Sequence, residues 1–359
     1  MKKTSASVAV LAAVAVVLAL AGCAGAAPAE PPTTSASPTP APTATQAAAP
    51  TVRVATTCDA LASQAQIDQA GGTHLPASTA AVTPNPPGYG NQRMGVLTCV
   101  WATSDPNTGA GPAVQISVVP DATRAGFEAY RTGEAVASSD TPSSVGPDAY
   151  TYCAGEPVVL CGFHALLPHY GIVGTVFGGG STLGDGARSA IDAMLAQTYG
   201  VVSGLAAPAT VWQPPAPALQ GASDCDAIVT SEQLTAATGV GPAHAAKSDD
   251  GEYSTSLFNV AHQVGAFWCG WVEDDGGTSF TIGVLPGGAT YLEHLRGSDA
   301  EEQPGVGDAA FWAPDGDLNV VADSGWLQVR AVPGEGKTAP THDQLAALAK
   351  QIIANLGTT

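Results

Sequence analysis

The stretch CDALAS at residues 58–63 returns as CDAIVT at residues 225–230, and this repeat decides how the rest of the chain is interpreted. The two copies stay in register without a gap through the segment that follows. In each copy a Ser or Thr is followed three residues later by Gln, a capping-box pattern that predicts the start of a helix. The pairs are Ser63 with Gln66 and Thr230 with Gln233.

A Cys-x-Trp motif is the second landmark that the copies share, at residues 99–101 and 269–271. It lies in strand-like sequence, and a strand ending at proline follows in each copy, at residues 116–120 and 282–286. A short helix, further strands and a final helix come next. In the second copy the final helix shows its apolar face as Leu345, Leu348, Ile352 and Leu356.

The order of elements within a copy is helix, strands, helix, strands, helix. This order predicts an α+β fold in which helices pack against an antiparallel sheet. We expect two tandem similar domains of this kind, at residues 53–206 and 223–359, each closing its own core. A Pro-rich linker at residues 207–222 joins them.

Residues 1–22 have the layout of a secretory signal peptide, with two lysines before an apolar run. The run is shorter than the roughly 20 apolar residues that a membrane span needs. It ends in Leu20-Ala21-Gly22-Cys23, which resembles the lipobox of bacterial lipoproteins. The resemblance implies cleavage before Cys23 and lipid on its sulfur; the alternative is an ordinary signal with an incidental cysteine. Residues 23–52 are rich in Ala, Pro, Thr and Ser, which is typical of an extended tether.

Charge restricts the class of partner. Removing residues 1–22 leaves 10 basic against 31 acidic residues, a net charge of −21. Nucleic-acid binding depends on Lys and Arg that neutralise phosphates, so we expect no nucleic-acid partner. The predicted contact with the membrane is therefore the N-terminal lipid, on the extracytoplasmic side.

Six cysteines remain once Cys23 is assigned to lipid, and an even count in an exported protein predicts three disulfides. Each copy contains a first-helix cysteine and a Cys-x-Trp cysteine, which most simply pair with each other. The other two occur only in the first copy, on either side of a predicted hairpin turn. The expected bridges are Cys58–Cys99, Cys225–Cys269 and Cys153–Cys161.

Together these landmarks resemble the actinobacterial DUF3558 family of lipoproteins, a domain of unknown function. The matching features are the lipobox, the tether, the Cys-Asp start of a capped helix, the Cys-x-Trp strand and the terminal helix. The chain is also distantly similar to extracellular sensor domains of mycobacterial receptor kinases. Two copies in one chain depart from the single-domain pattern of the family. The resemblance implies a fold and says almost nothing about function.

The sequence holds no nucleophile elbow, no zinc-protease motif and no phosphate-binding loop. His164 and His169 lack the further ligands that zinc requires, so neither a metal nor another cofactor is expected. These observations predict a binding or scaffold module of the cell envelope, with an envelope protein, a glycan or a small ligand as partner. The alternative is an envelope hydrolase with an unrecognised acid/base site.

Tryptophans give the best binding hypothesis that the sequence offers. Trp101 and Trp271 lie on the disulfide-bearing strands, so we expect them in the core. Trp268 should point to the face opposite Cys269. The candidate binding residues are Trp268, Trp312 and Trp326.

Overall fold

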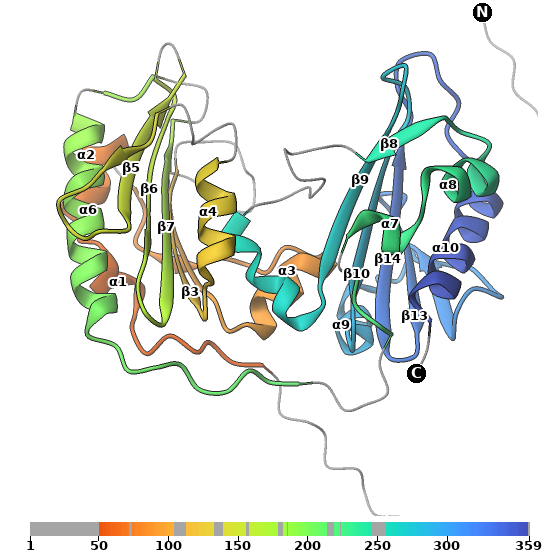
Figure 1. Cartoon of the computed structure of the whole chain (residues 1–359), viewed down its shortest axis with the longest axis horizontal. Coiled ribbons are helices and arrows are strands. Elements are labelled where there is room, and N and C mark those ends of the chain that lie inside the picture. The colour runs from red at the N-terminus through yellow and green to blue at the C-terminus, as the bar shows by residue number, and fades with distance from the viewer. Residues whose placement is uncertain are drawn as a thin grey trace, which may run out of the picture. The chain divides into compact units, whose positions relative to one another are not determined.

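Two antiparallel sheets, one from each copy of the repeat, organise the computed structural model (Figure 1). We call the elements from Cys58 to Ser203 lobe one and those from Cys225 to Leu356 lobe two. The structure describes residues 50–71, 74–103, 113–132, 139–155, 158–178, 182–184, 186–213, 219–222, 224–245 and 256–357. Cys23 and the signal peptide lie outside these residues.

Lobe one contains seven strands in its described part. Its helices are α1 (Cys58–Leu61), α2 (Gln64–Gly71), α3 (Pro86–Arg93), α4 (Arg124–Thr132) and α6 (Gly186–Ser203). Its strands are β1 (Ser78–Thr79), β2 (Leu97–Ala102), β3 (Ala113–Pro120), β4 (Thr141–Pro142), β5 (Ala149–Ala154), β6 (Leu160–Leu166) and β7 (Tyr170–Phe177).

Lobe two repeats this plan. Its helices are α7 (Cys225–Ile228), α8 (Ser231–Thr238), the 3-10 helix η2 (Ser256–Val264), α9 (Ala289–Leu295) and α10 (His342–Leu356). Its strands are β8 (Ala243–Ala245), β9 (Phe267–Glu273), β10 (Ser279–Leu285), β11 (Glu301–Glu302), β12 (Ala309–Trp312), β13 (Leu318–Ala322) and β14 (Gly325–Val332).

The strand order is the same in both lobes, which confirms the α+β fold with two similar antiparallel sheets. It is β1-β2-β3-β7-β6-β5-β4 in lobe one and, read from the same edge, β8-β9-β10-β14-β13-β12-β11 in lobe two. The register also repeats. On β6, His164 is opposite Val173, which is opposite Ser117. On β13, Asn319 is opposite Gln328, which is opposite Gly283. His164 and Asn319 therefore occupy equivalent positions.

Local signals start the first helices of each copy as the sequence predicts. The backbone nitrogen of Ser63 donates to the Gln66 side chain, and Thr230 with Gln233 forms a complete capping box. Gly239 ends α8 in the left-handed conformation, with a φ of 71°. This conformation suits glycine because it has no Cβ to clash with the following carbonyl.

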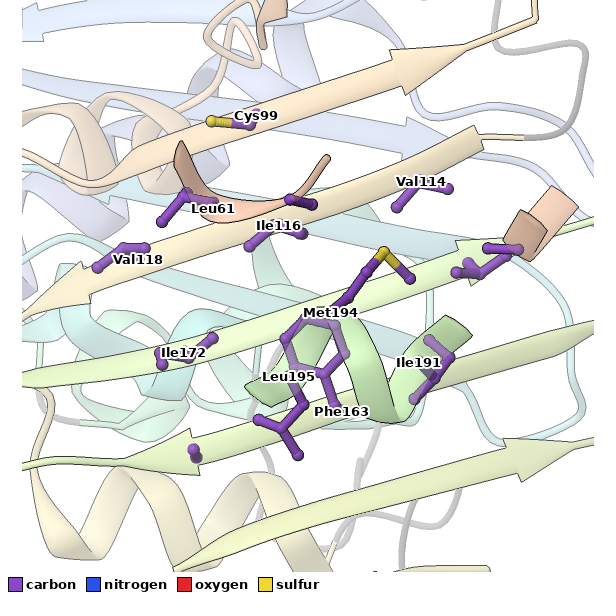
Figure 2. Packing of buried hydrophobic residues seen from close by; sticks show 14 of the residues in the cluster. Leu61, Cys99, Val114, Ile116, Val118, Phe163, Ile172, Ile191, Met194 and Leu195 are labelled. Carbon is purple, nitrogen blue, oxygen red and sulfur yellow. The ribbon is translucent and has the colours of Figure 1, made fainter. Parts of the chain in front are cut away.

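Each lobe has a hydrophobic core on one face of its sheet. In lobe one α6 brings Ile191, Met194 and Leu195 over the strand residues Ile116 and Phe163 (Figure 2). In lobe two α10 provides the corresponding apolar face. Trp101 and Trp271 are almost fully buried in these cores, as expected.

The three expected disulfides are present. Cys58–Cys99 and Cys225–Cys269 each join the first helix of a lobe to its Cys-x-Trp strand. Cys153–Cys161 crosses the β5–β6 hairpin, where the two cysteines are directly opposite each other.

A third hydrophobic cluster contains residues of both lobes, among them Phe127 and Val173 of lobe one and Phe258 and Trp326 of lobe two. Ala47–Thr359 form one compact unit. Each lobe thus closes a core of its own, and in addition the lobes share a core that the repeat did not predict. None of the helices within the described residues has the length and apolar character needed to cross a membrane.

Candidate binding site at the lobe joint

The lobes are joined by an exchange of equivalent segments. In each copy one short helix precedes the Cys-x-Trp strand: α3 in lobe one and η2 in lobe two. The α3 residue Tyr89 stacks on Tyr291 of lobe two, with ring centroids 4.3 Å apart. The η2 residue Phe258 lies 5.6 Å from Phe127 and 5.3 Å from Tyr130 of lobe one, measured between ring centroids. Each segment therefore packs against the other lobe.

The exchange is reciprocal in its hydrogen bonds. Both segments end at a glycine with positive φ, Gly95 at 70° and Gly265 at 74°. Two residues before these glycines stand Arg93 and Gln263. Arg93 Nη1 donates to the carbonyl oxygen of Pro286, just after β10, and Gln263 Nε2 donates to that of Asp121, just after β3, at 2.8 Å. Equivalent side chains thus bind equivalent ends of the partner lobe's central strands.

The α3 half of the joint contains a buried cation among aromatic rings. Arg93 is only 1% exposed. Its guanidinium carbon lies 5.5 Å from the ring centroid of Trp212, which comes from the linker. Tyr291 and Trp326 are buried, and Tyr89 contacts both of their rings. We call Arg93, Tyr89, Tyr291, Trp212 and Trp326 the arginine–aromatic cluster.

Two polar groups of this cluster have no hydrogen-bond partner, the Nε of Arg93 and the hydroxyl of Tyr291. Arg93 also forms no ion pair with any carboxylate in the described ranges. Burial lowers the pKa of Arg93 and raises the pKa of Tyr291 to about 12. Arginine nevertheless stays protonated in proteins, so a positive charge is held in the joint without a counter-charge.

The tryptophans predicted to bind a partner lie at three different places. Trp326 is fully buried in the joint, where its Nε1 donates to Asn319. Trp312 is buried in lobe two, where it stacks on His342 and donates to Gln303. Trp326 is 0% exposed and Trp312 is 4% exposed. Both side chains therefore belong to the protein interior, and neither ring is open to a partner. Trp268 is half-buried on the joint face, beside Gly283, and points away from the core as predicted.

His164 is the centre of a second buried polar cluster, on the equivalent face of lobe one. Its Nε2 lies 3.3 Å from Asp140 Oδ1, but neither ring nitrogen makes a hydrogen bond. Arg131 donates to Asp140 at 3.0 Å and lies over the ring of Tyr150, which stacks on His164. Burial lowers the pKa of His164 to about 4. Because His164 is fully buried, it does not reach a ligand on the surface.

Replacing His164 by asparagine, the residue at the equivalent position of lobe two, should flatten the dependence of stability on pH. The pKa of His164 is about 4 in the folded protein, against 6.5 for the ordinary side chain. Between these values the unfolded chain binds more protons, so stability present above pH 6.5 is lost as the pH falls. The expected loss from pH 7 to 4.5 is about 2 kcal/mol larger in the wild type than in His164→Asn.

Urea unfolding of both proteins at pH 7, 5.5 and 4.5 measures this difference directly. The comparison between variants cancels the carboxylates that titrate in the same range. Equal losses in the two proteins would show that His164 does not resist protonation in the fold.

The sequence did not single out Arg93, Tyr89 or Tyr291. One signal was present: at equivalent positions before the Cys-x-Trp strand, the first copy has Arg93 and the second has Gln263. The chain has only 12 basic residues, so an arginine in one copy where the other copy has a neutral glutamine marks Arg93 as a candidate functional residue.

Comparison of the chain with protein-family models, with curated proteins and with solved structures finds no match in any of the three. Among the described residues, no group of three or more His, Cys, Asp or Glu is placed to hold a metal ion.

Proposed function

We propose that the protein is a lipoprotein anchored on the extracytoplasmic side of the cell membrane through Cys23, and that it acts as a binding module of the cell envelope. The ligand site that we propose is the arginine–aromatic cluster. Three disulfides support an oxidising compartment, and the lipobox-like stretch before Cys23 supports the anchor. The observation that carries the binding role is Arg93, a buried cation with an unpartnered Nε among aromatic rings.

Ligand sites typically combine apolar and aromatic walls with a few polar groups that fix orientation. The cluster has this composition, with Tyr89, Tyr291 and Trp326 as walls and two unpartnered donors. It also lies between two lobes, where binding sites often occur. The predicted tether at residues 23–52 would hold such a site away from the membrane surface.

The anchor is tested by Cys23→Ala expressed in the native envelope. The wild type should fractionate with membranes, and the variant should be released or accumulate as uncleaved precursor, because two or three acyl chains are what hold such a protein on a bilayer. Immunoblots of membrane and supernatant fractions give the result. Mature Cys23→Ala that stays in the membrane fraction would refute the anchor.

The binding role is tested with a secreted form that begins at Ala24. Small molecules from an envelope extract are equilibrated with it and identified by mass spectrometry after gel filtration. Tyr89→Ser removes one aromatic wall, and Tyr199→Ser, at a half-buried residue that packs against the core of lobe one, is the matched control. A compound retained by wild type and Tyr199→Ser but lost from Tyr89→Ser supports the role. Retention by no protein, or equal retention by all three, contradicts it.

A further inference from the structure

We infer that the arginine–aromatic cluster binds a singly charged carboxylate, an inference that rests on the proposed binding function. The starting point is the cost of burying Arg93. A buried charge is normally paired, because an isolated one loses its hydration without compensation. Arg93 is 1% exposed, yet its guanidinium has one protein acceptor, the carbonyl of Pro286, and an unpartnered Nε.

The contact between the lobes does not need this charge. Gln263 occupies the equivalent position in η2 and makes the equivalent contact with a neutral amide, to the carbonyl of Asp121. The fold therefore contains an internal comparison in which an uncharged donor is sufficient. The contact between the lobes does not require the positive charge of Arg93, and binding of an anionic ligand accounts for that charge.

A second donor is available beside the guanidinium. The buried hydroxyl of Tyr291 has no partner, and its pKa of about 12 keeps it protonated at neutral pH. Tyr89 stacks on Tyr291 with ring centroids 4.3 Å apart, and Arg93 follows Tyr89 by four residues on the same face of α3, which brings Arg93 and Tyr291 to the same side of the helix. Together they offer charge-assisted hydrogen bonds to one oxyanion.

Trp212 occupies the face of the guanidinium in the structure. It is half-buried and comes from the segment between the lobes. A cation–π contact is weaker than a bidentate pair between arginine and carboxylate. A carboxylate binds the N–H edge of the guanidinium, in its plane, so it can pair with Arg93 while Trp212 stays on the face, and its arrival beside the ring should change the emission of this tryptophan.

The number of charges selects the class of anion. The cluster supplies one positive charge, so a monoanion is neutralised while a dianion keeps a buried negative charge. The net charge of −19 on the whole chain further disfavours a dianion. The planar fork of arginine fits a carboxylate, and the aromatic walls favour a flat apolar body attached to it.

The test titrates the secreted form with benzoate, benzamide and inorganic phosphate, followed by calorimetry and tryptophan fluorescence. Benzoate is expected to bind, and benzamide and phosphate at least tenfold more weakly. Arg93→Gln keeps a donor for Pro286, as Gln263 does, and should weaken benzoate binding at least tenfold. Tyr291→Phe should weaken it about threefold, and Trp212→Phe should abolish the fluorescence change but not the heat of binding.

Arg124→Gln is the matched control, because it removes one exposed, ion-paired arginine away from the cluster. It should bind benzoate like the wild type, and thermal melts confirm that each variant is folded. Equal affinity of wild type and Arg93→Gln for benzoate, or binding of benzamide or phosphate as tight as that of benzoate, overturns the inference. An envelope compound whose retention needs Tyr89 but not Arg93 would leave the binding function standing and remove only the carboxylate assignment.

Discussion

Replacing Cys225 and Cys269 together by alanine is expected to lower the free energy of unfolding by about 4 kcal/mol. A disulfide restricts the unfolded chain, and the restriction grows with the length of the loop that it closes. This bridge spans 44 residues, and Cys58–Cys99 spans 41. Urea unfolding of the double variant under non-reducing conditions measures the loss.

Cys153–Cys161 provides the matched comparison, because it spans only 8 residues. Its removal by the same double alanine substitution should cost about 2.5 kcal/mol, clearly less than either long bridge. If the short bridge cost as much as the long one, loop length would not govern their contributions. The β5–β6 register would then be the feature that the short bridge protects.

The repeat made much of the fold predictable because its signals are local. Capping boxes, the amphipathic face of α10 and the alternation around Cys269 involve residues a few positions apart. Comparison of the two copies then predicted contacts between residues that lie far apart in the sequence. A cysteine present twice at the same place has its partner in the same copy, so two bridges followed from the alignment and the third from elimination.

The joint was not predictable in this way, because its contacts depend on one copy being placed against the other. Only the structure shows that Trp326 is buried in the joint, where Tyr89 of α3 contacts its ring. The turn of η2 adds a second reason. Leu257, Phe258 and Asn259 all have positive φ, which is unfavourable for Leu and Phe, although asparagine tolerates it better. Tertiary packing overrides local preference there.

Phe258→Ala is therefore expected to have the other large effect, a loss of about 3–5 kcal/mol in the free energy of unfolding. The Phe258 ring is nearly fully buried against Phe127 and Tyr130 of lobe one, and it also helps to hold an unfavourable turn. Phe163→Ala, in the core of lobe one alone, is the matched control of equal size.

The two variants should differ in whether the two lobes stay associated after the linker is cut. A protease site replacing residues 214–218 allows the linker to be cut in the folded protein. The cut wild-type halves should stay together on gel filtration, since α3 and η2 hold them, while Phe258→Ala should release them. Phe163→Ala should lower stability without releasing the halves. Release of the cut wild type would contradict an interlocked joint.

A mutant cycle with Gly171 tests the same contact without relying on the linker. A Cβ at Gly171 would overlap the ring of Phe258, so Gly171→Ala alone should destabilise the protein by overpacking. Once Phe258→Ala has removed the ring, the two closest overlaps are gone, and of the three nearest atoms only the Cβ of Ala122, at 2.8 Å, still crowds the added methyl group. The double variant should therefore be more stable than the sum of the single losses predicts, by at least about 1 kcal/mol. Additive losses would mean that the two residues do not touch, and that η2 does not pack on the sheet of lobe one.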